Sequence, residues 1–286
     1  MKKQALTAYR RFLKATGTWG GKSIYSQHVK DPGMSAIIKR NRDTLSQIPQ
    51  WVPPDLTKNS IFRYGVNPDI ESLLDLPLDS ECTHTDLLVH FGRSLKTPCK
   101  YLELGVSVGK TLWLILNNCS PCECWGFDIE ELTPVLGKRL VEQSRQEWPS
   151  LPNSIKKTPS SISRFIHPES GSKLTYICAD IFDEKAWALL AGANFNLVLS
   201  DALHTAQALE FEWAHLSKAG IFNPEEVVIM WDDLDGEMKT WFQHKQKDIA
   251  NRLSIPGHKV TTAYVNGWLG CREFPHRLGL AMKKAA

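Results

Sequence analysis

The chain is dominated by a regular alternation of short apolar runs and stretches of helical periodicity. The apolar runs lie at residues 101–104, 124–128, 175–179, 196–200 and 227–231, and helical stretches follow them at residues 111–117, 136–148, 184–190, 206–216 and 237–247. Strands that are joined through helices pair in parallel, with helices on both faces of the sheet. Two last runs, at residues 259–265 and 278–282, have no helix between them and predict a closing antiparallel hairpin. The sequence therefore predicts an α/β fold with seven strands, most of them parallel.

The first 80 residues break this pattern and predict an N-terminal cap or arm, ahead of an α/β domain over residues 81–286. Prolines and glycines interrupt the segment, which holds 12 Lys and Arg against 7 Asp and Glu. A basic amphipathic helix is predicted near its start, with one face formed by Leu6, Tyr9, Phe12 and Leu13. We expect this helix to dock on the core or on a second copy in a homo-oligomer.

Two shorter segments have predictions of their own. Ser80 or Thr83 can cap a helix that runs through Leu87, Leu88, Phe91 and Leu95. Residues 149–171 are rich in Ser, Pro and Lys and have no clear periodicity, which indicates a mobile insertion or lid.

Composition narrows the class of protein. With 42% hydrophobic and 23% charged residues, the 286-residue chain is typical of a globular protein. No apolar run is long enough for a membrane-spanning helix. The sequence also lacks the dense run of Lys and Arg that is typical of a nucleic-acid-binding arm. Seven cysteines without the density of a disulfide scaffold fit a reduced, cytoplasmic protein. An organelle transit peptide stays open, because the first acid is Asp31.

The strongest local motif follows the first predicted strand. It places Glu103, Gly105, Ser107 and Gly109 ahead of a helix that opens with Lys110 and Thr111. Glycines let a ligand approach the backbone closely, and a helix N-terminus favours polar or anionic groups. A phosphate loop needs four residues between its glycines, whereas only three separate Gly105 from Gly109. The dinucleotide motif also fails, because Ser107 stands where its second glycine belongs.

An acid at the end of the next strand turns this loop into a candidate nucleoside site. Asp128 lies 23 residues after Gly105, where a carboxylate can accept both hydroxyls of a ribose. The acid two residues before Gly105 suits a cationic end of the ligand.

The spacing of Glu103, Gly105 and Gly109 resembles the acid-x-Gly-x-x-x-Gly motif of class I S-adenosylmethionine-dependent methyltransferases. The resemblance covers about residues 83–286 and implies a Rossmann-like sheet whose seventh strand inserts antiparallel. It also implies that the loop cradles the methionine portion, that Asp128 holds the ribose and that Asp180 contacts the adenine. The cofactor-binding residues predicted in this way are Glu103, Gly105, Ser107, Gly109, Lys110, Thr111, Asp128, Asp180 and Asp201.

A second cluster follows the fourth and fifth strands. Asp201 and His204 end the fourth, and Asp232 and Asp233 end the fifth, so parallel pairing brings them to one rim. Three carboxylates can bind a hard divalent cation, and His204 can act as a general base. The cluster resembles metal-dependent natural-product O-methyltransferases of the macrocin and cephalosporin-hydroxylase-type group. That resemblance implies a Mg²⁺ site made by Asp201, Asp232 and Asp233, although Asp232 stands where the group tends to have Glu.

These patterns predict a methyltransferase that moves a methyl group from S-adenosylmethionine to a hydroxyl of a small, natural-product-like acceptor. Magnesium would orient the acceptor oxygen, and His204 with Asp201 would form the catalytic pair. Two alternatives stay open: a metal-independent N-methyltransferase of a small molecule or a peptide or protein side chain, and a non-catalytic nucleoside-binding homologue. An RNA methyltransferase is disfavoured, because basic and aromatic residues do not interleave.

Overall fold

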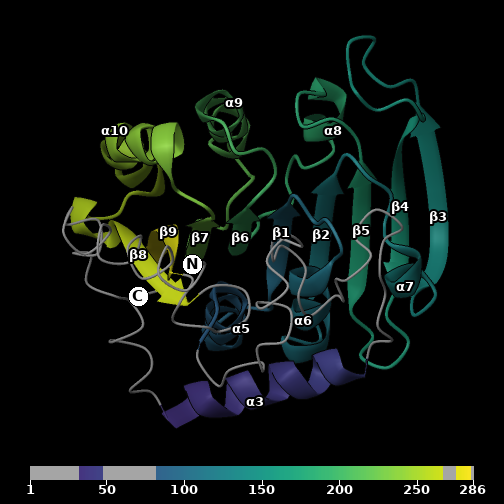
Figure 1. Ribbon diagram of the computed structural model, residues 1–286, viewed down its shortest axis with the longest axis horizontal. Helices are drawn as coiled ribbons and strands as arrows, with labels where there is room; N and C mark the ends of the chain where they lie inside the picture. The colour runs from purple at the N-terminus through teal and green to yellow at the C-terminus, as the bar shows by residue number, and fades with distance from the viewer. Residues whose placement is uncertain (1–31, 48–81, 267–274, 285–286) are drawn as a thin grey trace, which may run out of the picture.

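The computed structural model describes residues 32–47, 82–266 and 275–284, and these residues form one mixed α/β sheet structure (Figure 1). The sheet has nine strands in the order β3-β4-β5-β2-β1-β6-β7-β9-β8. Their bounds are β1 Lys100–Leu104, β2 Glu123–Asp128, β3 Val141–Trp148, β4 Ser160–Ile166, β5 Lys173–Cys178, β6 Leu197–Ser200, β7 Val227–Trp231, β8 Val260–Asn266 and β9 Pro275–Lys283.

The centre of the sheet confirms the predicted α/β architecture. Strands β5, β2, β1, β6 and β7 are parallel to one another, and β9 inserts antiparallel between β7 and β8. The apolar runs of these strands are buried on both faces, as expected for a parallel core covered by helices. The predicted number of seven strands is wrong, because two more strands extend the sheet beyond β5.

Helices cover the sheet on two sides. Figure 1 shows α3, α5 and α6 on one side and α8, α9 and α10 on the other. Along β1, Tyr101 packs in the core on the side of α3, α5 and α6, and Leu102 packs in the core on the side of α8, α9 and α10, because successive strand side chains point to opposite faces. The helical bounds are α3 Pro32–Ser46, α5 His84–Ser94, α6 Lys110–Asn118, α7 Pro134–Gly137, α8 Glu184–Ala188, α9 Ala206–Leu216 and α10 Gly236–Leu253, with a 3₁₀ turn at Gly257–Lys259.

The largest departure from the sequence prediction is an antiparallel hairpin, β3–β4, on the free edge of β5 (Figure 1). The predicted helix over residues 136–148 is wrong: α7 ends at Gly137, and β3 begins at Val141. The predicted lid over residues 149–171 is wrong in part, since β4 occupies Ser160–Ile166. Strand β3 has no apolar alternation because it is an edge strand whose side chains are exposed except for Trp148.

Several predictions fall on residues that the structure does not describe. They include the amphipathic helix near Leu6, the proposed oligomer contact through it, and most of the Pro-rich stretch before residue 82. Among the residues that are described, no helix is both long and apolar enough to span a membrane.

Trp148 is predicted to hold the β3–β4 hairpin onto the rest of the fold. Its indole N–H donates to Asp183 Oδ2 at 2.9 Å, and the ammonium of Lys185 lies 5.2 Å from its ring centroid. Trp148→Ala removes a buried aromatic side chain, a change that typically costs about 3–5 kcal/mol. We expect amides of β3 and β4 to lose protection in hydrogen exchange while those of β1 and β2 keep it. Val141→Ala, at the 51% exposed end of β3, is the control, and equal protection in both variants would contradict the prediction.

Candidate functional site

The candidate site lies at the rim where the parallel strands end. Strand β1 pairs with β2 on one side and with β6 on the other, so the connections leave the sheet in opposite directions at this point. Ligands of open α/β sheets bind in the crevice that such a switch point creates. The loops after β1, β2, β5, β6 and β7 carry the side chains that the sequence singled out.

Gly105 forms the tightest contact of this rim. Its φ of +82° is left-handed, and a Cβ on it would lie 2.1 Å from the carbonyl oxygen of Asp201. The amide of Gly105 donates to Phe127 O at 2.8 Å, and the amide of Asp201 donates to Leu104 O at 2.8 Å. The glycine therefore lets the loops after β1 and β6 touch through their backbones. The sequence analysis expects this glycine to let a ligand approach, and Gly105 does line two cavities, while the position of its missing Cβ is taken by the backbone of Asp201.

Asp128 holds the turn that follows Gly105. Its Oδ2 accepts the amides of Val106 at 2.6 Å and Ser107 at 2.7 Å, and its Oδ1 accepts the amide of Glu130 at 2.8 Å. A carboxylate has about four acceptor sites, and the described residues occupy three of those of Asp128, so Oδ1 can accept one further hydrogen bond from a ligand hydroxyl. Gly109, with φ +78°, is the N-cap of α6, and a Cβ on it would collide with the side chain of Leu136.

A larger cavity of about 450 Å³ opens beside Asp128, within the size range of small-molecule sites. Its walls are mainly apolar, and Asp128 and Asp180 are its two acids. Asp180 also accepts hydrogen bonds from the amide of Phe182 at 3.0 Å and from the hydroxyl of Ser154. The other lining residues that matter here are Phe127, Ile129, Ile155, Ile181, Phe182 and Leu203.

A smaller cavity of about 60 Å³ also borders Gly105, and charged side chains line it. Its acids are Glu103, Asp201 and Asp232, and its nitrogen-bearing side chains are His84 and Lys110. The loop from Gly105 to Val108, together with Thr85 and Thr111, completes the lining. The two cavities share Gly105, so a single elongated ligand could occupy both.

Crowding perturbs the ionisation of the smaller cavity. Burial, with Asp201 and Asp128 nearby, raises the pKa of Glu103 well above its usual value, although its carboxylate accepts the hydroxyl of Tyr101 at 2.8 Å. Partial burial and the neighbouring Asp232 raise the pKa of Asp201 to about 7. Burial and the charge of Arg42 lower the pKa of Lys110 to about 7. A cavity with such shifted groups is a candidate functional site.

His204 stands between two acids at the mouth of the site. Its Nε2 lies 3.1 Å from Asp201 Oδ1, and its Nδ1 lies 3.6 Å from Asp233 Oδ2. Its hydrogen bond to Asp201 raises the pKa of the imidazole, whose side chain is 48% exposed. Asp201 and Asp232 both line the smaller cavity, and Asp201 and Asp233 both lie beside His204. Over the described ranges, no three His, Cys, Asp or Glu side chains form a group that could hold a metal ion.

The structure adds site residues that the sequence analysis missed. His84 and Thr85 come from the first turn of α5, and Thr85 Oγ1 shares a hydrogen bond of 3.1 Å with Thr111 Oγ1, which also lines the smaller cavity. Ser154 and Ile155 come from the loop between β3 and β4. The Thr83-x-x-Asp86 spacing predicts where α5 begins, but it does not predict that this end of the helix lines a cavity.

Comparison with known proteins gives structural similarity only. No family model and no curated protein matches the sequence. A Bacillus cereus O-methyltransferase in complex with SAH is 13% identical, with a TM-score of 0.41 over 92% of this chain and 98% of the other. A SAH-bound methyltransferase of Podospora anserina is 11% identical, with a TM-score of 0.37 over 87% and 88%. A cofactor-bound protein from MTB is 13% identical, with a TM-score of 0.43 over 88% and 90%. Such likenesses do not assign an activity to this chain.

Gly105→Ala is expected to destabilise the site through a backbone collision. The added Cβ would force apart the loops after β1 and β6, on top of the left-handed strain of about 1–2 kcal/mol. Gly171→Ala is the matched control, because Gly171 has φ +68° but open space around the new Cβ. Urea denaturation should show an excess loss of about 1 kcal/mol or more in the Gly105 variant. Equal losses in the two variants would contradict the close approach.

Proposed function

We propose that the chain is an S-adenosylmethionine-dependent O-methyltransferase with a small-molecule acceptor. The observation that carries this proposal is the pair of cavities that meet at Gly105, one apolar between two acids and one small and charged. Such a pair suits a ligand that has a nucleoside at one end and an amino acid at the other. S-adenosylmethionine has this form, and when bound it supplies a methyl group already activated on a sulfonium.

The larger cavity fits the nucleoside end. Asp128 Oδ1 has acceptor capacity for a ribose hydroxyl, and Asp180 can accept from the exocyclic amine of adenine. Ile129 and Ile181 provide apolar walls for the base. The exposed side chains of Ile155 and Leu203, at 80% and 45%, lie at this cavity and would lose water contact when a base covers them.

The smaller cavity fits the amino-acid end. A zwitterion needs an anion near its ammonium and donors near its carboxylate. Glu103 and Asp201 supply the anions, and a cation beside them would favour the charged form that burial now disfavours. Lys110, Thr85 and Thr111 supply the donors, at the N-terminal turns of α6 and α5.

In this proposal, His204 removes the proton of the acceptor hydroxyl. Its side chain is half-exposed at the mouth of the site, where an acceptor can reach it. Asp201 orients the imidazole and stabilises its protonated form. The protein otherwise aligns the two reactants and excludes water, which accounts for much of the rate of a displacement between bound groups.

The predicted magnesium ion has no step in this scheme. His204 engages Asp201 and Asp233, and within the described part of the chain no three acidic, His or Cys side chains form a group that could hold a metal ion. Assays in excess chelator test the point. Turnover that disappears with chelator and returns with Mg²⁺ would restore the metal-assisted mechanism.

The first prediction of this proposal is that the chain binds S-adenosylhomocysteine by calorimetry. Asp128→Asn should weaken binding by on the order of 10-fold, because a ligand hydroxyl and the amides of the turn after Gly105 lose a charged acceptor. Glu123→Gln is the control, at the exposed opposite end of the same strand. Binding of NAD or ATP in place of S-adenosylhomocysteine would overturn the proposal. Binding without turnover of any hydroxyl acceptor would favour the non-catalytic homologue.

The second prediction concerns pH. A general base must be deprotonated, and Asp201 raises the pKa of His204, so kcat/KM should rise with pH through an apparent pKa above 6.5. Asp201→Asn removes the carboxylate and should move this rise to lower pH. His204→Ala should abolish the rise and lower the rate by on the order of 10²–10⁴-fold. A profile that is unchanged in both variants would exclude His204 as the base.

A further inference from the structure

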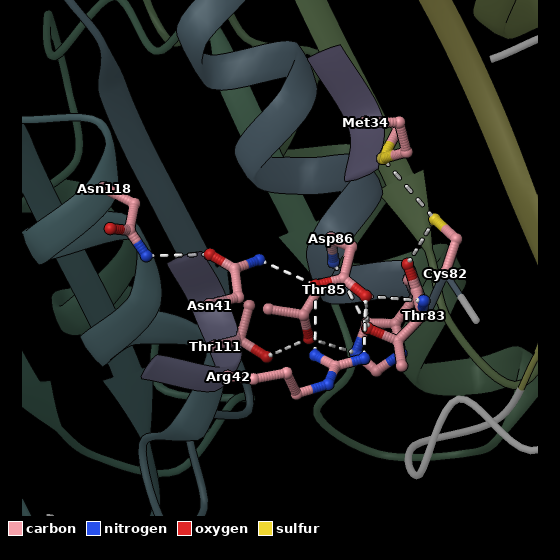
Figure 2. A network of polar contacts seen from close by, with 10 residues as sticks. Met34, Asn41, Arg42, Cys82, Thr83, Thr85, Asp86, Thr111 and Asn118 are labelled. Atoms are coloured by element: carbon pink, nitrogen blue, oxygen red, sulfur yellow. Dashed lines mark hydrogen bonds and ion pairs between the residues drawn. The ribbon is translucent and has the colours of Figure 1, made fainter. Parts of the chain in front are cut away.

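The helix α3 contributes a buried ion pair that lies close to the smaller cavity. Figure 2 shows Asn41 and Arg42 of α3 directed at Asp86 of α5. Arg42 donates to both carboxylate oxygens of Asp86, at 3.2 Å and 3.1 Å, and Asn41 Nδ2 donates to Oδ1 at 2.7 Å. The Asp86 side chain has no solvent exposure, whereas that of Arg42 is 18% exposed. The same Asn41 accepts a hydrogen bond from Asn118 of α6 at 2.7 Å, so one network joins three helices.

Asp86 also determines where α5 begins. Its Oδ2 accepts the amide of Thr83 at 2.8 Å and the Thr83 hydroxyl at 2.9 Å, while the amide of Asp86 donates back to that hydroxyl. This is a capping box, and it fixes the first turn of the helix. The carboxylate that receives Arg42 is therefore the group that holds this turn in place.

The two residues inside that turn line the smaller cavity. Thr85 Oγ1 lies 3.2 Å from His84 Nε2 and 3.1 Å from Thr111 Oγ1, which belongs to the first turn of α6 (Figure 2). The turn thus joins the start of α5 to the start of α6 at the wall where the amino-acid end of the ligand would lie. A shift of this turn would move His84 and Thr85 together.

We infer that Arg42 is a positioning residue: through Asp86 it holds the first turn of α5, and with it Thr85, where Thr85 recognises the carboxylate of the cofactor's amino-acid end. This inference rests on the proposed function and adds to it that the site is incomplete without α3. The larger cavity shares no residue with the network, so the nucleoside end should not depend on Arg42.

The experiment compares two ligands that differ in the amino-acid end. S-adenosylhomocysteine has it, and 5′-methylthioadenosine lacks it. In the full-length chain, Arg42→Ala should weaken the binding of S-adenosylhomocysteine by on the order of 10-fold, because hydrogen bonds between charged groups, such as those from Arg42 to Asp86, are stronger than neutral ones. The affinity for 5′-methylthioadenosine should change by less than about 2-fold. Arg42→Lys keeps the charge but not the two-pronged geometry, so it should recover part of the affinity. Arg40→Ala, an exposed arginine of the same helix, is the control and should change neither affinity.

Thermal denaturation of each variant accompanies the binding measurements. A variant that is only destabilised should bind both ligands less well, so parallel losses would overturn the inference, as would an unchanged affinity for S-adenosylhomocysteine. If Arg42→Ala fails to fold, Thr85→Val removes one hydroxyl of the same turn at nearly constant volume and must show the same selective loss. Binding of neither ligand by the wild-type chain would overturn the proposed function as well.

Discussion

The close approach of Gly105 to the backbone of Asp201 determines how the site is built. A side chain at this position would separate the loops after β1 and β6, because the new Cβ would lie 2.1 Å from a carbonyl oxygen. With glycine, the two loops meet, and their contact divides the rim into the two cavities. The larger cavity has mainly apolar walls with two acids, Asp128 and Asp180, and the smaller one has three acids and the two nitrogen-bearing side chains His84 and Lys110. The chemical asymmetry of the site therefore follows from one backbone contact at the switch point of the sheet.

The charged cavity is held together at a cost in stability. Burial and mutual repulsion disfavour the ionised forms of Glu103 and Asp201, and burial disfavours the cationic form of Lys110. A fold selected for stability alone would place apolar residues here. A ligand that has both an ammonium and a carboxylate would stabilise the ionised forms of the acids and of Lys110 by pairing with their charges. The unfavourable arrangement therefore supports the proposed zwitterionic ligand.

Local signals were enough to predict the centre of the fold but not its edges. The buried parallel strands appear as apolar runs, and α9 and β7 have the predicted bounds, because burial on both faces leaves a continuous pattern in the sequence. Strand β3 has no such pattern, since it is defined by pairing with β4 and by Trp148 alone. The sequence also did not predict that His84 and Thr85 line the smaller cavity. Their position depends on the contact between α5 and α3, which lies more than 40 residues earlier in the chain, and no local spacing predicts that contact.

The two ends of the site depend on elements outside the repeated β–α units. The loop between β3 and β4 brings Ser154 to Asp180, and Lys156 of the same loop donates to Ile129 O at 3.2 Å and lies 2.9 Å from Cys178 Sγ. The other end is formed by α5, whose first turn is tied to α3. The central strands supply the glycine turn and the acids, which suit any ligand of this general shape. Under the proposed function, selection among such ligands therefore falls to the hairpin loop at the nucleoside end and to α3 and α5 at the amino-acid end, and these two helices also pack into the hydrophobic core.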